Sequence, residues 1–338
     1  MNFPDINPVE RSQRVGFLLI DGFALLSFAS AVEPLRAANL LGGGELYCIR
    51  TITVAGEEAR SSSGAVIPGV SFHSVPAGLD LLLVVAGGDP LKFDAPRELI
   101  SWLRMQDQNG TTIGGVSGGP VILASCGLMK GRRMTVHWEH SPALRELEPE
   151  VLLEQALYII DRNRITCAGG TAPLDLMHSL ITERHGPDFA RLVSDWFMHT
   201  EVRHWRQPQR AGLVERHGTT NRAVLNAIRA MEDHVADPLS LSQLASLSEV
   251  GERQLSRQFA AEFGVSVMRF YRTLRLRVAA GMLTGSSLPL TDIALASGFA
   301  DSSHFSRVFS SSYGVSPRAF RRGAAATGHQ EPKMKSPG

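Results

Sequence analysis

The sequence predicts an α/β domain followed by an all-α domain. Between Arg14 and Arg203, short apolar runs alternate with amphipathic helical stretches. This alternation is typical of a mostly parallel sheet that is covered by helices on both faces. From Leu239 to Arg322 only helical periodicity remains, and it occurs in two related copies. The length of 338 residues also fits two domains of ordinary size.

Each apolar run of the first domain predicts one element. Strands are expected at 14–20, 47–54, 79–85 and 111–116, and a hairpin is expected at 157–168. Helices are expected at 23–40, 95–108, 118–126, 171–184 and 189–200. Ligands of parallel sheets bind at the carboxyl ends of the strands. We therefore expect functional side chains in the loops that follow the strands.

A glycine-rich turn at 114–120 carries Ser117 from a predicted strand directly into a helix. Residues 115–119 satisfy the pattern G-x-S-x-G, which in several hydrolase folds presents a nucleophile on a sharp turn. The backbone N–H groups of Gly118 and Gly119 suit a carboxylate, and Gly88 follows the neighbouring strand. The turn therefore predicts either a nucleophile or a ligand pocket.

The second domain contains one helix-turn-helix pattern twice. Residues 255–266 and 305–316 align at an offset of 50, and six of the twelve positions are identical. In each copy a short apolar helix precedes a second helix, which Gly264 or Gly314 ends. Ser242 and Thr291, or the residues beside them, are the expected caps of the short helices.

The polar positions of the second helices predict DNA contacts. In a DNA-binding helix-turn-helix this helix enters the major groove, where Arg, Gln, Ser and His read base edges. The predicted DNA-binding residues are Arg253, Gln254, Ser256, Arg257, Ser302, Ser303, His304 and Arg307. Residues 267–283 between the copies span roughly 25 Å if helical. Two recognition helices on such a rod would lie about one DNA turn apart, roughly 34 Å.

The distribution of charge supports this prediction. Residues 221–323 contain 12 Arg, no Lys and 8 acidic residues, a formal charge of +4 in a chain of +1. Basic charge is therefore concentrated where DNA phosphates would lie. The alternative is a helical bundle with a solvated arginine face, which two motifs at this spacing disfavour.

Two resemblances follow from these motifs. Residues 221–322 resemble the C-terminal domain of the AraC/XylS family of transcription regulators, and the tract from Ile293 to Pro317 carries the signature. Residues 14–203 resemble the class I glutamine amidotransferase-like (DJ-1/PfpI) domain, which is flavodoxin-like, in the version found in GlxA-like regulators. The motifs for the second likeness are the 114–120 turn, residues 131–138 and Cys167–Thr171.

The resemblance implies a ligand site without catalysis. In the enzymes of the superfamily the residue at the turn is a Cys, and the chemistry depends on its thiolate. Here Ser117 stands in that place. The expected ligand-binding residues are Glu33, Gly88, Ser117, Gly118, Gly119, His137 and Trp138. No cofactor and no metal site are expected.

Three of these side chains have a second interpretation. Glu33 is either a pocket acid or the surface partner of Arg36. His137 is either a base for Ser117 or a structural histidine. Trp138 either packs in the core or holds a quaternary ammonium group by cation–π attraction. Motifs at 33–39, 137–139 and 168–172 resemble regulators of carnitine and betaine catabolism, which implies a carboxylate or quaternary-ammonium, amino-acid-like effector.

The predicted organisation has five parts. They are an extension at 1–13, a ligand-sensing domain at 14–203, a linker at 204–220, a DNA-binding domain at 221–323 and a disordered tail at 324–338. The three cysteines are far apart and indicate a reducing compartment. Neither a signal peptide nor a membrane-spanning run is evident, so a cytoplasmic protein is expected.

These observations predict a ligand-responsive, sequence-specific transcription activator. It would form a homodimer through the N-terminal domain, bind promoter half-sites in adjacent major grooves and contact RNA polymerase. One alternative is an amidase or hydrolase that uses Ser117 and carries an appended DNA-binding domain. The other is a DNA-binding protein whose first domain only dimerises.

Overall fold

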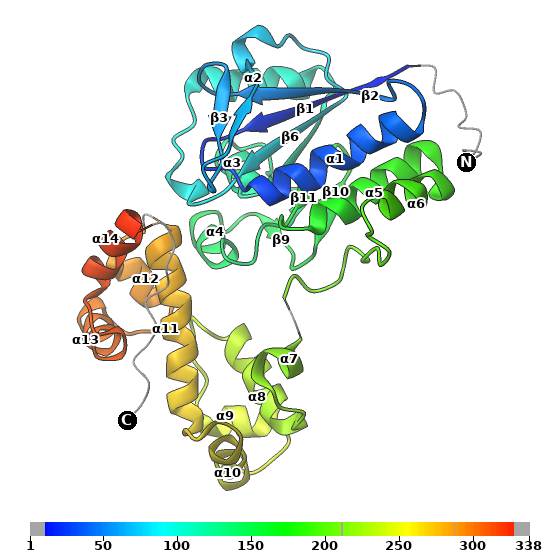
Figure 1. Ribbon diagram of the computed structural model, residues 1–338. Helices are drawn as coiled ribbons and strands as arrows, with labels where there is room; N and C mark the ends of the chain where they lie inside the picture. Colours follow the sequence, from blue (N-terminus) through cyan, green and yellow to red (C-terminus); the bar gives the residue numbers. More distant parts are fainter. Residues whose placement is uncertain (1–10, 211, 287, 328–338) are drawn as a thin grey trace. The chain divides into compact units, whose positions relative to one another are not determined.

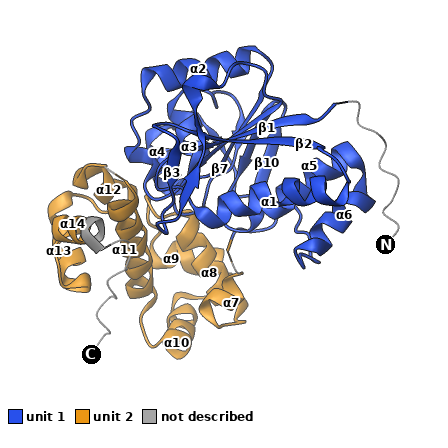
Figure 2. Cartoon of the chain, turned by 45° about the horizontal axis from the view of Figure 1, so that its top comes forward, with its two compact units in different colours: residues 1–209 blue, residues 210–338 orange. Residues whose placement is uncertain are grey.

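The computed structural model describes residues 11–210, 212–286 and 288–327 (Figure 1). The chain divides into two compact units, Met1–Gln209 and Arg210–Gly338 (Figure 2). Unit 1 extends beyond the predicted boundary at 203, because Trp205 packs against its core and Gln209 hydrogen-bonds within it. A short helix, α7 (Leu213–His217), occupies part of the predicted linker.

A seven-stranded sheet with the order β10-β11-β7-β6-β1-β2-β5 forms the centre of unit 1. Its strands are β1 (Gln13–Leu19), β2 (Tyr47–Thr53), β5 (Val70–Ser71), β6 (Leu81–Ala86), β7 (Thr112–Ser117), β10 (Tyr158–Asp161) and β11 (Arg164–Cys167). Every neighbouring pair in this sheet is parallel except the β10–β11 hairpin. The predicted fold class is confirmed.

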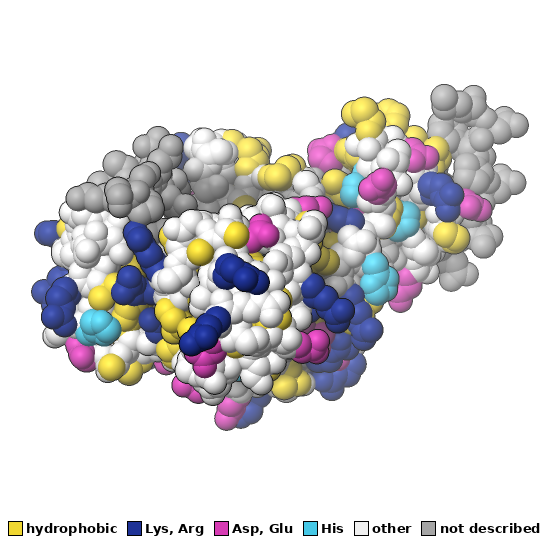
Figure 3. Space-filling view, turned by 90° about the horizontal axis from the view of Figure 1, so that it is seen from below, with side chains coloured by type: hydrophobic (Ala, Val, Ile, Leu, Met, Phe, Trp, Pro, Cys, Tyr) yellow, Lys and Arg dark blue, Asp and Glu magenta, His cyan; other side chains and the backbone are white. Residues whose placement is uncertain are grey.

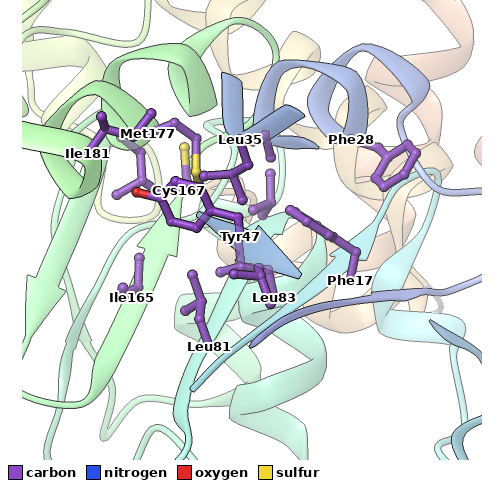
Figure 4. Packing of buried hydrophobic residues seen from close by; sticks show 14 of the residues in the cluster. Phe17, Phe28, Leu35, Tyr47, Leu81, Leu83, Ile165, Cys167, Met177 and Ile181 are labelled. Carbon is purple, nitrogen blue, oxygen red and sulfur yellow. The ribbon is translucent and has the colours of Figure 1, made fainter. Parts of the chain in front are cut away.

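Helices cover both faces of this sheet (Figure 1). α1 (Leu25–Leu41), α5 (Ala172–His185) and α6 (Pro187–Trp196) pack on one face, and α2 (Arg97–Gln108) and α3 (Gly119–Ser125) pack on the other. Successive residues of β6 alternate between the two cores: Leu81 and Leu83 join the first, and Leu82 joins the second. Figure 4 shows the first core, where Phe17, Leu35 and Met177 are among the labelled residues.

The shortest elements of unit 1 have no counterpart in the prediction. They are the strands β3 (Glu58–Arg60), β4 (Val66–Pro68), β5, β8 (Arg133–Met134) and β9 (Leu152–Leu153), the helix α4 (Ser141–Leu147) and the 3-10 turns η1 (Phe72–Ser74) and η2 (Pro90–Lys92). The strands and 3-10 turns have two or three residues each and are too short to show a period, and the seven residues of α4 span only about two helical turns.

Unit 2 is helical. Its helices after α7 are α8 (Arg222–Asp233), α9 (Leu241–Leu247), α10 (Glu252–Phe263), α11 (Val267–Gly285), α12 (Leu290–Ala296), α13 (Ser302–Tyr313) and α14 (Pro317–Thr327). The pairs α9–α10 and α12–α13 are the two predicted copies, and α11 joins them. Gly264 and Gly314 are left-handed and end α10 and α13, as predicted.

Three predictions for unit 2 differ from the structure. Ser240 caps α9 in a capping box with Gln243, whereas Ser242 lies inside the helix. Helix α12 begins after Pro289, so Thr291 is also internal. The disordered tail was predicted to start at residue 324, but α14 continues to Thr327. The rest of the predicted tail, residues 328–338, lies outside the described ranges. Within those ranges, no helix has both the length and the apolar character needed to cross a bilayer.

Candidate functional site

The turn after β7 has the geometry of a nucleophile elbow. Ser117 is the last residue of the strand and has a φ of 60°. That left-handed conformation costs a non-glycine residue on the order of 1–3 kcal/mol. The neighbouring glycines make the turn possible: a Cβ at Gly119 would lie 1.9 Å from the carbonyl oxygen of Val84. A Cβ at Gly115 would lie 2.4 Å from the nitrogen of Pro120.

Ser117 lies under the turn that follows β11. Only 7% of the surface of Ser117 is exposed. A Cβ added to Gly169, which has a φ of 93°, would lie 2.7 Å from the Cβ of Ser117. The next residue, Gly170, donates its N–H to the Oγ of the buried Ser27 on α1 at 2.8 Å. Three segments that are far apart in the sequence therefore meet at Ser117.

One of the two predicted anion donors is already used. The N–H of Gly118 donates to the carbonyl of Ala86 at 3.1 Å, and this bond joins the elbow to the end of β6. The prediction that Gly118 offers its N–H to a carboxylate is therefore wrong. Gly88 lies in the loop after β6 with a φ of 60°, and a Cβ there would meet no atom within 4 Å.

Glu33 pairs with Arg36 one helical turn away on α1. The carboxylate oxygen lies 2.7 Å from an Nη of Arg36, and this hydrogen bond raises the pKa of the guanidinium. Both side chains are about half exposed, at 40% and 51%. Of the two interpretations of Glu33, pocket acid or surface partner of Arg36, the structure shows the pairing with Arg36.

The segment between β8 and α4 carries His137 and Trp138. The Thr135 N–H donates to Thr166 Oγ1 on β11 at 2.9 Å, which fixes the start of this segment. Burial lowers the pKa of His137, and Glu139, whose Oε2 lies 3.7 Å from Nδ1, opposes that shift. Trp138 is 44% exposed, so the alternative of core packing is excluded. Its ring centroid lies 5.2 Å from that of His137.

The groups that a hydrolase needs are not assembled here. In the described part of the chain, no hydrogen bond joins Ser117 to His137. Burial raises the pKa of the Cys126 thiol and raises that of Cys167 to about 12, so neither forms a thiolate near neutral pH. Within the described ranges no group of three or more His, Cys, Asp or Glu side chains is placed to bind a metal ion.

The sequence reading missed a buried ion cluster around Asp175. This carboxylate is fully buried in the first turn of α5. It accepts hydrogen bonds from the Nε2 of His199 at 2.9 Å and from the backbone N–H and Nη2 of Arg203, both at 2.7 Å. Arg203 also donates to Thr171 at 2.9 Å. The available signal was an acid inside an apolar helix, but its partners lie more than twenty residues away.

Both recognition helices present the predicted side chains. On α10, Arg253, Gln254 and Arg257 are exposed and Ser256 is half-buried, whereas Leu255 and Phe259 are fully buried. On α13, Ser303, His304 and Arg307 are exposed and Ser302 is half-buried, whereas Phe305 and Phe309 are fully buried. Several Lys and Arg side chains are visible on the face drawn in Figure 3.

An unpredicted residue caps the second recognition helix. Asp301 accepts a hydrogen bond from the His304 N–H at 2.7 Å, and that bond lowers the pKa of its carboxyl group. The cap fixes where α13 begins, and so which of its residues point outward in the first turn.

Comparison with known proteins gives the same two parts. The pattern of the DJ-1/PfpI family matches residues 13–183, and that of a helix-turn-helix domain matches residues 244–323. The HTH-type transcriptional regulator GlxA of Rhizobium meliloti is 41% identical over 310 residues, which cover 92% of this chain and 96% of that protein. The HTH-type transcriptional regulator CdhR of Pseudomonas aeruginosa is 39% identical over 336 residues, covering 96% and 99%.

A solved structure supports the fold. A ThiJ/PfpI family protein from Pseudomonas syringae superposes with a TM-score of 0.52 at 23% sequence identity, and the match covers 72% of this chain and 95% of that one. At this level of identity the likeness concerns architecture alone.

Proposed function

The chain belongs to the DJ-1/PfpI family and is a helix-turn-helix transcriptional regulator, and from that premise we propose that it is an activator controlled by a small metabolite bound in unit 1. Relatives that match almost the whole chain are regulators and not enzymes. In the described residues no hydrogen bond joins Ser117 to His137, which agrees with that role. The proposal concerns what unit 1 binds and what binding does.

The observation that carries the effector class is the exposed ring of Trp138 beside His137 and Glu139. An indole ring attracts a quaternary ammonium group, and a carboxylate nearby adds a charge of the right sign. The distance of 3.7 Å between Glu139 and His137 places that charge at the ring pair. We therefore favour an amino-acid-like compound that carries a quaternary ammonium group, such as a betaine, over a simple anion. The resemblance to regulators of carnitine and betaine catabolism agrees with this choice.

We also propose that α10 and α13 read two half-sites in adjacent major grooves. Each helix buries two large apolar side chains and exposes an Arg at the equivalent position, Arg257 or Arg307. The connecting helix α11 has 19 residues and is therefore about 28 Å long. That length is close to one turn of DNA, roughly 34 Å.

The proposed homodimer would form through unit 1. Helices α1 and α6 cover the same face of the sheet and leave large apolar side chains exposed: Leu26 and Leu40 on α1 and Trp196 on α6. Burial of such side chains favours association. Analytical ultracentrifugation of the full chain tests this proposal, and a monomer at micromolar concentration would contradict it.

The effector proposal is tested by unfolding the full chain with and without glycine betaine, carnitine and simple carboxylates. All four tryptophans lie in unit 1, so their fluorescence reports that unit within the intact protein. A ligand at a hundred times its dissociation constant should stabilise unit 1 by about 2.7 kcal/mol. Trp138→Ala should abolish the effect. Val66→Ala, which removes an exposed apolar side chain from β4, should retain it.

The direction of regulation is tested separately. In vitro transcription from a promoter that carries the selected DNA site should increase when both protein and effector are present. If neither glycine betaine nor carnitine stabilises unit 1, the proposed effector class is refuted. Reduced transcription in the presence of protein and effector would show a repressor. Activation also requires a contact with RNA polymerase, which the same assay detects.

A further inference from the structure

The turn of the second helix-turn-helix copy packs directly against the loop that precedes the first copy. Gly298, between α12 and α13, has a φ of 76°. A Cβ at this position would lie 2.4 Å from the carbonyl oxygen of Val235 and 2.9 Å from Cδ of Pro238. Both residues belong to the loop between α8 and α9. The contact therefore leaves no room for a side chain, and it joins segments about sixty residues apart.

Two side chains of α11 stabilise this contact. Arg275 donates from Nη1 to the carbonyl of Gly298 at 2.6 Å, and its guanidinium lies 4.7 Å from the ring centroid of Phe299. One helical turn earlier, Tyr271 is 1% exposed. Its hydroxyl donates to the carbonyl of His234 and accepts the N–H of Leu239 at 3.3 Å. Arg275 thus bonds to the turn of the second copy, and Tyr271 bonds to the loop that precedes the first copy.

We infer that Arg275, with Tyr271 and Gly298, sets the spacing between the two DNA blocks that the chain recognises. Each recognition helix is fixed within its own copy by fully buried aromatic or aliphatic residues. Helix α11 fixes their separation, and Arg321 of α14 links the second copy to the end of α11 by donating to the carbonyl of Leu283. The Arg275–Gly298 bond adds a second link about two helical turns earlier, and two separated links oppose rotation of the second copy about the axis of α11. A shift of one base pair moves a half-site by about 3.4 Å and turns it by about 35°.

This inference rests on the proposed function, because it assumes that both recognition helices contact DNA. Arg275 acts as a positioning residue. Its guanidinium is engaged with a protein carbonyl and an aromatic ring, and burial lowers its pKa. An arginine that donates from a planar fork and stacks on a ring is not replaced fully by lysine.

The test is selection of binding sites from a random duplex library by the full chain. The wild type should select two sequence blocks at one spacing. Arg275→Gln and Gly298→Ala should select the same two blocks at several spacings. On a duplex with both blocks at the wild-type spacing, their affinity should fall by about tenfold, because the second helix no longer binds from a fixed position. Affinity for a duplex that carries one block should not change, and this result also shows that the variant is folded.

Arg277→Gln is the matched control, since Arg277 is an exposed arginine on the same helix. It should keep the single spacing. Arg275→Lys, which retains a donor group, should select a range of spacings that is wider than that of the wild type and narrower than that of Arg275→Gln. If Arg275→Gln does not fold, Tyr271→Phe weakens the same junction by removing only a hydroxyl.

The outcomes separate the two ideas. A wild type that selects one block, or none, contradicts the two-helix function itself. A wild type that selects two blocks, together with junction variants that keep its single spacing and its affinity, overturns the positioning role of Arg275. A variant that loses affinity for single-block and two-block duplexes equally also overturns it, because the loss is then structural.

Discussion

Ser117 and Gly169 approach so closely that a Cβ at position 169 would collide with that of Ser117. Gly169→Ala should destabilise unit 1 by about 2–4 kcal/mol, because the new Cβ meets Ser117 at 2.7 Å in a left-handed conformation. Adding Ser117→Gly removes the opposing Cβ and should restore part of the loss. Urea unfolding followed by tryptophan fluorescence measures both effects. Equal stability of the single and double variants would show that the two residues do not interact.

His140 makes the stability of unit 1 depend on pH. The residue is 4% exposed, and burial lowers its pKa from 6.5 to about 4, with a smaller contribution from His137. Between these values the unfolded chain binds more protons than the folded one. Stability is therefore complete above about pH 6.5 and is lost as the pH falls towards 4. Lowering the pH from 7.5 to 5 should cost about 2 kcal/mol through this residue.

The variant His140→Phe keeps a ring in the same space and removes the titration. The free energy of unfolding should then fall less over the same pH range. His137 also has a lowered pKa, so some dependence in the same direction will remain. An unchanged pH profile in His140→Phe would show that other groups cause the acid sensitivity.

At the scale of elements, the sequence was informative wherever a repeating pattern extends over a whole element. The buried run that forms β6 and the two helix-turn-helix copies were predicted because each spans enough residues to show its period. Ser240 rather than Ser242 caps α9, because a cap depends on where the first turn closes. The occupied N–H of Gly118 and the partners of Asp175 were not predictable. Those bonds join residues that only the folded chain brings together.

The two recognition helices should make separable contributions to DNA binding. Arg257→Ala and Arg307→Ala should each weaken specific binding by about 1–3 kcal/mol if the arginine contacts a base. Each change should relax sequence preference in one block only, since α10 and α13 belong to different copies. Selected-site sequencing of the two variants provides the measurement. Loss of preference in both blocks from either variant would indicate a shared contact or misfolding.

At the scale of the whole molecule, a ligand in unit 1 affects DNA binding only if it favours one state of the chain over another. Gln209, the last residue of unit 1, is held beside the proposed effector site. The two N–H groups of its Nε2 are shared among three acceptors: Thr135 Oγ1 at 3.1 Å, the Val136 carbonyl at 3.0 Å and the Ala156 carbonyl at 2.7 Å. Val136 directly precedes His137. We therefore expect a change at His137 and Trp138 to reach Gln209, the residue from which the chain enters unit 2.

Gln209→Ala should uncouple the effector from DNA without removing either binding event. The variant loses the three bonds but leaves Trp138 and the recognition helices unchanged. We expect unit 1 to be stabilised by effector as in the wild type and DNA affinity without effector to be preserved. The effector-dependent change in DNA affinity should shrink towards a factor of one, from a coupling typically worth about 1–3 kcal/mol. Gln207→Ala, which removes an exposed glutamine two residues earlier, is the matched control. A full effector response in Gln209→Ala would mean that coupling runs by another route, such as the ion cluster of Asp175 and Arg203.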